Sequence, residues 1–448
     1  MKTHRRGRIL GSVAAISVAG IALAGCTGGP GTGGNGGGDG GGDGGEDDNV
    51  VTIYGTISGT EAELLEESWA EWEEENGIDI EYEASQEFEA QIAVRAQGGS
   101  APDLAIFPQP GLLADMATRG FLVEAPEAVK ANAEEYWTDL WQGFGTVDDT
   151  FYGAPLMASV KGWIWYSPAT FEENGWEIPT TWQGLKDLTA QIAEETDGPP
   201  WCVGFGSDAA TGWPGTDWIE DVVLRQSGTD VYDQWVANEI PFTDPQIKSA
   251  FDEVGSIILN PEYVNAGYGD VQSIGTTPFG DPATALASGD CLLHHQASFY
   301  DGFIVDAGAT VAEDGDIWAF ITPPFEESDG GAATVTGGGE IVGAFDDSES
   351  TQAVQEYLSS PEWANSRVSL GGVISANKGL DPANASSAIL SEAIELLQDD
   401  ATTFRFDGSD LMPSSVGAGT FWQGMRDWVN GTDTDTVLEQ IESGWPSS

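Results

Sequence analysis

Residues 50–107 contain the pattern that most constrains the fold, because short apolar segments alternate there with amphipathic ones. Three segments of β-branched or alternating apolar residues are predicted to be strands, at 50–57, 78–84 and 104–107. The two segments between them have apolar residues at helical spacing and end at Asn76-Gly77 and Gly98-Gly99, which predicts two helices. Strands and helices alternating at this density indicate an α/β fold with a parallel sheet covered by helices.

Ligands of such sheets bind beyond the carboxyl ends of the strands. Those ends are predicted at Thr56–Ser58, Ser85-Gln86 and Pro108–Pro110.

The remaining chain continues the same mixture of elements. A hairpin is predicted at Asp148-Asp149, a short strand at 163–166 and a helix opened by the residues Pro179–Trp182. A further strand is predicted at 341–345, directly after Gly337–Glu340, and the last 75 or so residues are predicted to be mostly helical. The part from residue 50 onwards is long enough for two domains.

The N-terminal segment has the pattern of a secretory signal. A basic start is followed by an apolar run from Ile9 to Ala24, and the run ends in Leu23-Ala24-Gly25-Cys26, which resembles the lipobox of bacterial lipoproteins. We therefore expect residues 1–25 to be a lipoprotein signal peptide and Cys26 to carry the lipid anchor. Residues 27–49 are mostly Gly and Asp and are expected to form a flexible tether, so that 26–49 join the anchor to the globular part. An uncleaved anchor or an ordinary secretory signal is the alternative.

The charge of the chain excludes several classes of partner. The sequence has 74 Asp plus Glu against 15 Lys plus Arg, a formal net charge of −59. Phosphate groups are bound by clustered Lys and Arg, so nucleic acid and anionic lipid surfaces are poor partners. An acidic excess of this size is typical of a saline or alkaline habitat, because salt screens the repulsion between the acids.

The cysteines and histidines of the sequence indicate whether disulfides and metal sites are expected. With Cys26 assigned to the lipid, Cys202 and Cys291 remain, and in an oxidising compartment we expect them to be bridged rather than free. After the signal segment the histidines are His294 and His295, adjacent in sequence and without the spacing of zinc ligands. We predict no metal site and no cofactor.

Several blocks of sequence, in this order, resemble the extracellular solute-binding proteins (family 1) of sugar ABC importers. These blocks are Ala101–Leu104, Tyr152–Leu156, Trp165–Ser167, Pro179–Trp182, Ala344-Phe345, Leu358–Trp363 and Phe421-Trp422. Two more blocks, Ala210–Trp218 and Leu293–Ser298, resemble the α-glucoside-binding branch of that family.

The resemblance implies a two-lobed periplasmic-binding-protein-like fold (type II), in which each lobe is a mostly parallel sheet flanked by helices and the hinge is made of crossing strands. Lobe 1 is expected at 50–157 and 336–372, and lobe 2 at 158–335 and 373–448. The implied function is binding, not catalysis. A lipid-anchored monomer on the outer face of the cytoplasmic membrane would bind a small oligosaccharide, such as an α-glucoside, and deliver it to the transmembrane subunits of an ABC permease.

Sugar recognition requires aromatic faces for the CH side of a pyranose and planar polar groups for its hydroxyls. Trp422 lies where the family places a stacking aromatic, with Arg426 one helical turn later on the same face. Trp213, Asp217 and Trp218 are predicted to lie in a Gly- and Pro-rich loop at the cleft, although most tryptophans of any chain belong to the core.

The other sugar-binding candidates each have a structural alternative. Arg426 and Lys161 stand out because bases are scarce, yet either could form a structural ion pair. Gln109 follows a strand end, where it could also cap a helix. Gly338, Gly339 and Glu340 could present backbone amides to a ligand or form a plain turn, and His295 could face the cleft or be structural.

A surface-tethered glycoside hydrolase is the alternative function. Hydrolysis requires two carboxylates about 5 to 9.5 Å apart, and a chain with 74 acids does not exclude such a pair by composition. A peptide- or metal-binding protein of similar shape is a weaker alternative, because the loops are aromatic and no metal ligands cluster in the sequence.

Overall fold

The computed structural model describes residues 49–265, 267–325, 334–399 and 401–446. The predicted signal peptide, Cys26 and almost all of the tether lie outside the described residues. The strands are β1 (Val50–Gly55), β2 (Asp79–Ala84), β3 (Leu104–Phe107), β4 (Thr146–Val147), β5 (Thr150–Phe151), β6 (Pro155–Val160), β7 (Trp163–Tyr166), β8 (Leu293–Gln296), β9 (Trp318–Ile321), β10 (Thr334–Ala344) and β11 (Thr403–Phe406).

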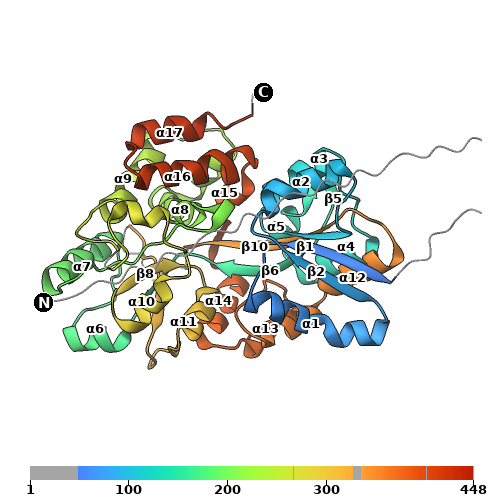
Figure 1. The fold of residues 1–448 in the computed structure, drawn as a ribbon, viewed down its shortest axis with the longest axis horizontal. Coiled ribbons are helices and arrows are strands. Elements are labelled where there is room, and N and C mark those ends of the chain that lie inside the picture. Colours follow the sequence, from blue (N-terminus) through green and yellow to red (C-terminus); the bar gives the residue numbers. More distant parts are fainter. Residues whose placement is uncertain (1–48, 266, 326–333, 400, 447–448) are drawn as a thin grey trace, which may run out of the picture. The chain divides into compact units, whose positions relative to one another are not determined.

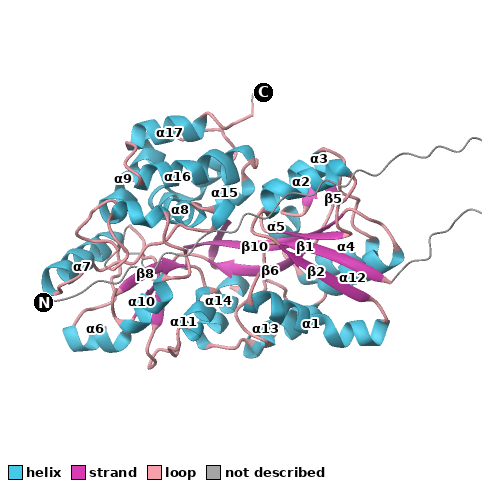
Figure 2. Cartoon of the chain, viewed as in Figure 1, coloured by secondary structure: helices cyan, strands magenta, loops and turns pink. Residues whose placement is uncertain are grey.

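The α-helices surround these strands (Figures 1 and 2). They are α1 (Thr60–Asn76), α2 (Phe88–Gly98), α3 (Pro110–Thr118), α4 (Glu127–Tyr136), α5 (Asp139–Gly143), α6 (Pro168–Asn174), α7 (Trp182–Glu195), α8 (Trp213–Val236), α9 (Pro245–Ile258), α10 (Pro282–Ser288), α11 (Tyr300–Asp306), α12 (Glu349–Leu358), α13 (Pro361–Ser369), α14 (Ala388–Gln398), α15 (Gly408–Leu411), α16 (Trp422–Val429) and α17 (Thr434–Glu442). A π-helical segment, Ser415–Phe421, leads directly into α16.

The first sheet has the strand order β11-β10-β3-β1-β2, with β6 also paired to β10. Its strands β1, β2 and β3 are parallel, as the alternation in residues 50–107 predicts, whereas β10 runs antiparallel to β3. Alternate residues of the strands face opposite helices. Ile53 and Ile106 share a core with Trp69 of α1, while Tyr54 packs in a separate core that includes Phe88 of α2. Helices therefore cover both faces of the sheet.

The second sheet has the order β8-β7-β9, and β7 pairs antiparallel with both neighbours. This corrects the expectation of a mostly parallel sheet in lobe 2. In the described part of 158–325, parallel pairing consists of isolated bridges, such as those of Trp201 with Leu293 and Val264. Strand β7 follows β6 after Lys161 and Gly162 alone, so the chain enters the second sheet directly from the first. The α/β class itself agrees with the structure.

The passage from β6 to β7 needs a glycine. Gly162 has φ +79°, and a Cβ atom there would lie 2.3 Å from a carboxylate oxygen of Asp221 on α8. A larger residue would therefore be strained and would collide with a buried acid. This junction brings Lys161 to the place where the two sheets meet.

The structure also contains the predicted hairpin and the predicted disulfide. The hairpin at Asp148-Asp149 joins β4 and β5, and the predicted disulfide joins Cys202 to Cys291, with 5.7 Å between their Cα atoms. Strand β11, from the range expected in lobe 2, pairs with β10 of the first sheet, so the lobe boundaries remain a prediction. Within the described ranges no helix is long and apolar enough to span a bilayer.

Candidate binding cleft

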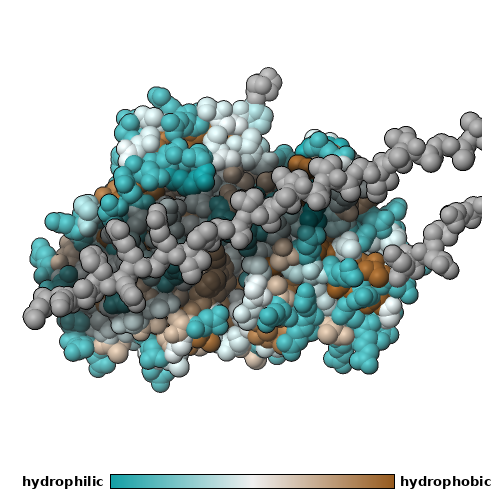
Figure 3. All heavy atoms as spheres, viewed as in Figure 1, coloured by the Kyte–Doolittle hydropathy of each residue, from teal (hydrophilic) through white to brown (hydrophobic). Residues whose placement is uncertain are grey.

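A cleft of about 1790 Å³ lies beyond the carboxyl ends of the parallel strands. Its wall includes Thr56–Ser58, Gln86 and Pro108-Gln109 from the first sheet, which are the strand ends singled out in the sequence. Facing them are residues of α8, α11 and α16. On the face drawn in Figure 3, hydrophilic residues dominate, and the surface is hollowed near its middle, where apolar residues are visible.

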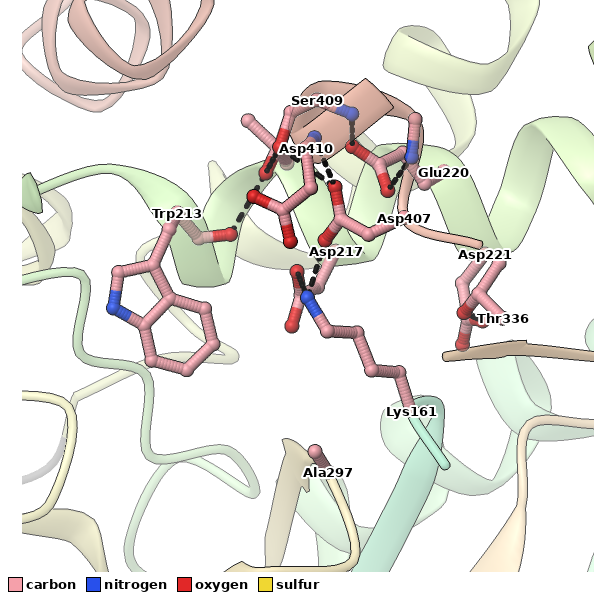
Figure 4. A network of polar contacts seen from close by, with 12 residues as sticks. Lys161, Trp213, Asp217, Glu220, Asp221, Ala297, Thr336, Asp407, Ser409 and Asp410 are labelled. Atoms are coloured by element: carbon pink, nitrogen blue, oxygen red, sulfur yellow. Dashed lines mark hydrogen bonds and ion pairs between the residues drawn. The ribbon is translucent and has the colours of Figure 1, made fainter. Parts of the chain in front are cut away.

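Lys161 lies at the centre of a buried network in this wall (Figure 4). Its ammonium bonds to Asp217 of α8, at 2.8 Å, and to Asp407, the residue that follows β11. Glu220 accepts bonds from the backbone N–H groups of Gly408 and Ser409, at 2.8 and 2.9 Å. The network therefore ties the β6–β7 junction to α8 and to the start of α15.

The electrostatics of the network depend on burial. Burial raises the pKa of Asp217, Glu220 and Asp410. Burial alone would lower the pKa of Lys161, but the carboxylates of Asp217 and Asp407 hold it well above its usual value. The ammonium is thus kept charged by its acids.

Asp217, Glu220 and Asp407 lie close enough together to hold a metal ion, with ligand atoms within 4.8 Å of one another. The Lys161 ammonium and the two backbone N–H groups already bind these carboxylates, so we assign no metal to them.

Asp221 forms a second hub one turn further along α8. Its carboxylate accepts bonds from Thr336 of β10 at 2.6 Å and Arg225 at 2.7 Å, and pairs with His295 of β8 at 2.9 Å. Burial opposes ionisation, but the Arg225 guanidinium and the bonds from His295 and Thr336 hold the pKa of Asp221 well below its usual range. Asp221 therefore connects α8 to β10 of the first sheet and to β8 of the second.

The segment predicted as a loop at Trp213, Asp217 and Trp218 is instead the start of α8. Pro214 occupies the first turn of the helix, where proline is tolerated because its missing N–H would be unpaired anyway. Trp213 lines the cleft, and its ring centroid lies 5.6 Å from Lys161 Nζ. Asp217 lies behind the wall in the ion pair. Trp218 is buried, its ring stacked on His295 at 4.2 Å, so neither of these two rings lines the cleft.

Trp422 also lines the cleft, at the point where the π-helical segment becomes α16. It is 4% exposed, and its Nε1 has no hydrogen-bond partner among the residues described. Gly212 permits this arrangement: its φ is +123°, and a Cβ atom there would lie 2.3 Å from the Trp422 carbonyl oxygen. Arg426 does not contribute to the wall. Its guanidinium donates to Gln423 on the same helix.

Gln109 lies at the N-terminus of α3 without capping it. Its Nε2 donates to Glu89 at 3.1 Å, and its Oε1 accepts no bond within the described part of the chain.

Gly338, Gly339 and Glu340 line the cleft, but they belong to β10 and not to a turn before it. The pairing with β6 shifts register opposite Glu340, where Leu156 and Met157 face one residue. Such bulges change the direction of side chains. Burial and the nearby Glu61 raise the pKa of Glu340 to about 7.

Several lining residues were not singled out in the sequence. They are Glu61, Glu89, Phe279, Phe299, Asp301, Arg367, Asp407 and Asp410. Glu61 and Glu89 follow predicted strand ends closely, so the strand-end rule could have found them. Arg367, Asp301 and Asp407 come from the distant segments α13, α11 and the residue after β11, and no local pattern marks them.

The fold and cleft define a two-lobed binding protein of the type II class. The chain belongs to the bacterial extracellular solute-binding protein family, whose model matches residues 57–365.

Two curated relatives match most of the chain. An α-glucosides-binding periplasmic protein, AglE of Rhizobium meliloti (strain 1021), is 38% identical over 89% of this chain and 87% of its own. The osmoprotective compounds-binding protein GgtB of Synechocystis sp. (strain ATCC 27184 / PCC 6803 / Kazusa) is 38% identical over 88% of this chain and 92% of its own.

Among solved structures, the bacterial solute receptor AcbH matches with a TM-score of 0.73 and 16% identity, covering 88% of this chain and 97% of that one. It is described as having an exclusive preference for β-D-galactopyranose. The resemblance read from the sequence is confirmed, and so is its class of function: the relatives and fold neighbours are binding proteins, not enzymes.

Proposed function

We propose that the protein is the membrane-tethered sugar-binding component of an ABC importer, which binds an α-glucoside or related small oligosaccharide in the cleft and delivers it to the permease. The observation that carries this proposal is the pairing of aromatic and polar surfaces in one cleft. The rings of Trp213 and Trp422 lie in the same wall as the Lys161 network, and Gln109 lines the cleft with them.

Trp422 Nε1 and Gln109 Oε1 are buried polar atoms that have no partner in the described residues. Such atoms cost free energy unless a ligand supplies the missing bond. Sugar hydroxyls can both donate and accept, so one sugar could satisfy both atoms. Within this proposal Trp213, Trp422, Gln109, Gly338, Gly339 and Glu340 contact the sugar. Lys161 and Asp217 position the wall, while Trp218, His295 and Arg426 have structural roles.

The lipid anchor, the monomeric state, the lobe boundaries and the docking on a permease are proposed from the sequence. The lipobox at Leu23–Cys26 supports lipid anchoring at Cys26, with the acidic tether as spacer. We further propose a monomer with lobe 1 at 50–157 and 336–372 and lobe 2 at 158–335 and 373–448, docking on the transmembrane subunits of a permease.

A thermal-shift screen with maltose, trehalose, sucrose and raffinose tests the sugar class. A ligand at 100 times its Kd stabilises the folded state by about 2.7 kcal/mol, so each sugar is used at about 10 mM, which covers any Kd below about 0.1 mM. At least one α-glucoside should raise the Tm and be recovered intact after prolonged incubation. No shift with any of them would overturn the proposed ligand class, and release of monosaccharide would favour the hydrolase.

A second candidate ligand class is the osmoprotective compounds, because GgtB is as similar as AglE and the net charge of −59 is typical of a saline or alkaline habitat. Repeating the screen in about 1 M NaCl with glycine betaine added tests an osmoprotective compound that is not a sugar. A shift with betaine and none with any glucoside would favour this candidate.

A further inference from the structure

The cleft wall contains many more acidic than basic residues. Lys161 and Arg367 are the bases that line it. The acids are Glu61, Glu89, Asp208, Asp281, Asp301, Asp306, Glu340, Asp407 and Asp410. A ligand that enters the cleft therefore meets acidic side chains on both sides. Burial raises the pKa of Glu61, Glu89, Asp301, Glu340 and Asp410, so their negative charge increases towards alkaline pH.

Both bases are already surrounded by acids. Lys161 bonds to Asp217 and Asp407. Arg367 is fully buried and donates from Nη1 to the Gly371 carbonyl at 2.8 Å, and the fields of Glu61 and Glu340 oppose the lowering of its pKa by burial. Its Nε and Nη2 have no acceptor within the ranges described. A ligand anion approaching these donors would also approach Glu61 and Glu340, which repel it when they are ionised. A hydroxyl oxygen would not be repelled.

Asp301 has a buried carboxylate oxygen without a hydrogen-bond donor in the described part of the chain. This residue of α11 is 4% exposed; its Oδ2 accepts a bond from Ser387 at 2.9 Å, and its Oδ1 has no partner in the described structure. A buried carboxylate oxygen without a donor is costly. Gln109 presents a second acceptor of this kind, Oε1, in the same cleft. Within the described residues, Trp422 Nε1 and Arg367 Nε and Nη2 are unpaired donors in the same cleft, so the ligand must accept bonds as well. The unpaired acceptors additionally require a ligand that donates, through hydroxyl or ammonium groups.

We propose that the cleft selects its glycoside by charge: it admits neutral sugars, binds ammonium-bearing sugars more tightly, and excludes sugars that carry a carboxylate or phosphate. This inference rests on the proposed function and adds to it the chemical class of the ligand.

The test compares ligands that differ in charge but hardly in shape. Maltose, trehalose and sucrose are each altered at C6 of one glucose unit. A 6-amino-6-deoxy sugar is compared with its parent hydroxyl sugar, and a 6-carboxylate is compared with its 6-carboxamide. If C6 is crowded, both members of a pair weaken together, and the ratio of their Kd values still reports charge.

Calorimetry at about pH 8, where these acids are more fully ionised and the amine is still protonated, should show the amine binding about tenfold more tightly than the parent. The carboxylate should bind about tenfold or more weakly than the carboxamide. The net charge of the whole protein would also repel an anion, but that effect is screened in about 1 M NaCl, where the Debye length is about 3 Å. Buried groups are screened much less, so both ratios should persist at that salt concentration.

The variant Asp301→Asn tests whether the effect arises in the cleft, because it removes one buried acidic group at nearly constant shape. It should reduce both ratios severalfold at the same pH. Asp197→Asn is the matched control, since Asp197 is exposed and does not line the cleft. If Asp301→Asn fails to fold, Glu61→Gln removes a charge from the opposite wall.

Ratios near one for a parent sugar that binds would overturn charge selection and leave the proposed function intact. Kd ratios that fall to one at about 1 M NaCl would assign the effect to the overall charge of the protein. Kd ratios that change as much in Asp197→Asn as in Asp301→Asn would do the same. Either result would overturn charge selection by the cleft. Failure of all parent sugars to bind would overturn the proposed function itself, and this inference with it.

Discussion

Trp422 is the residue on which the proposed binding can be tested most directly. Trp422 lines the cleft, and aromatic residues in such positions commonly contribute about 2 kcal/mol or more to binding. Trp422→Ala should therefore weaken the best sugar of the screen by roughly 30-fold, as measured by calorimetry.

Because Trp422 is buried, its truncation will also lower the Tm. Trp176→Ala is the control: Trp176 is buried outside the cleft, so this variant should lose stability and keep its affinity. Equal affinities of Trp422→Ala and wild type would place Trp422 in the core and direct attention to Trp213.

Lys161 is expected to be essential for stability. Lys161→Met removes the cation and leaves Asp217 and Asp407 buried with one another, and breaking a buried pair in this way typically costs 3–5 kcal/mol, so a loss of about that size is expected in urea denaturation. Lys186→Met, which breaks the partly exposed pair with Glu253 at 2.6 Å, should cost about 1 kcal/mol or less. Similar losses in both variants would contradict the central role of Lys161.

Glu340 makes the stability depend on pH. Burial raises its pKa in the folded state from 4.5 to about 7. The folded state therefore holds a proton that the unfolded state has released, and its stability falls as the pH rises from about 4.5 to about 7.

Glu340→Gln keeps the shape without the charge, so its Tm relative to wild type should be higher at about pH 8 than at about pH 4.5. Glu172→Gln, which removes an exposed acid, should show no such change. A constant difference between Glu340→Gln and wild type at both pH values would refute this prediction.

At the scale of elements, the disulfide joins the segment before α8 to the residues just before β8. It closes a loop of 89 residues, for which the chain-entropy model gives about 4 to 5 kcal/mol. Replacing both cysteines by alanine should lower the free energy of unfolding by up to that amount in urea. Reductant should then destabilise wild type but not the double variant. Two free thiols in denatured, unreduced wild type, detected by alkylation and intact-mass measurement, would show that the bridge does not form.

At the scale of the whole molecule, charge repulsion dominates the electrostatics. The chain has five times as many acids as bases, so most acids have no cation to pair with, whatever the fold. Raising NaCl from about 10 mM to about 1 M shortens the Debye length from about 30 Å to about 3 Å. The Tm should therefore rise by several degrees across this range. A Tm that stays constant would mean that the acids lie too far apart to repel one another.

The amino-acid sequence by itself determined the local structure. Hydrophobic spacing and glycine stops located β1 to β3 and the helices between them, because these features depend on neighbours a few residues apart. The disulfide followed from counting cysteines, and the family from blocks spread along the chain.

Only the tertiary structure decided which residues meet in the cleft. Lys161 and Asp407 are 246 residues apart, and Arg367 and Asp301 reach the same cavity from different helices. Trp213 begins a helix where its Gly- and Pro-rich surroundings favoured a loop, and Arg426, one turn from Trp422, turns to Gln423 instead of the cleft. The physical reason is that burial and pairing over long sequence separations depend on how whole elements pack, which short-range patterns do not encode.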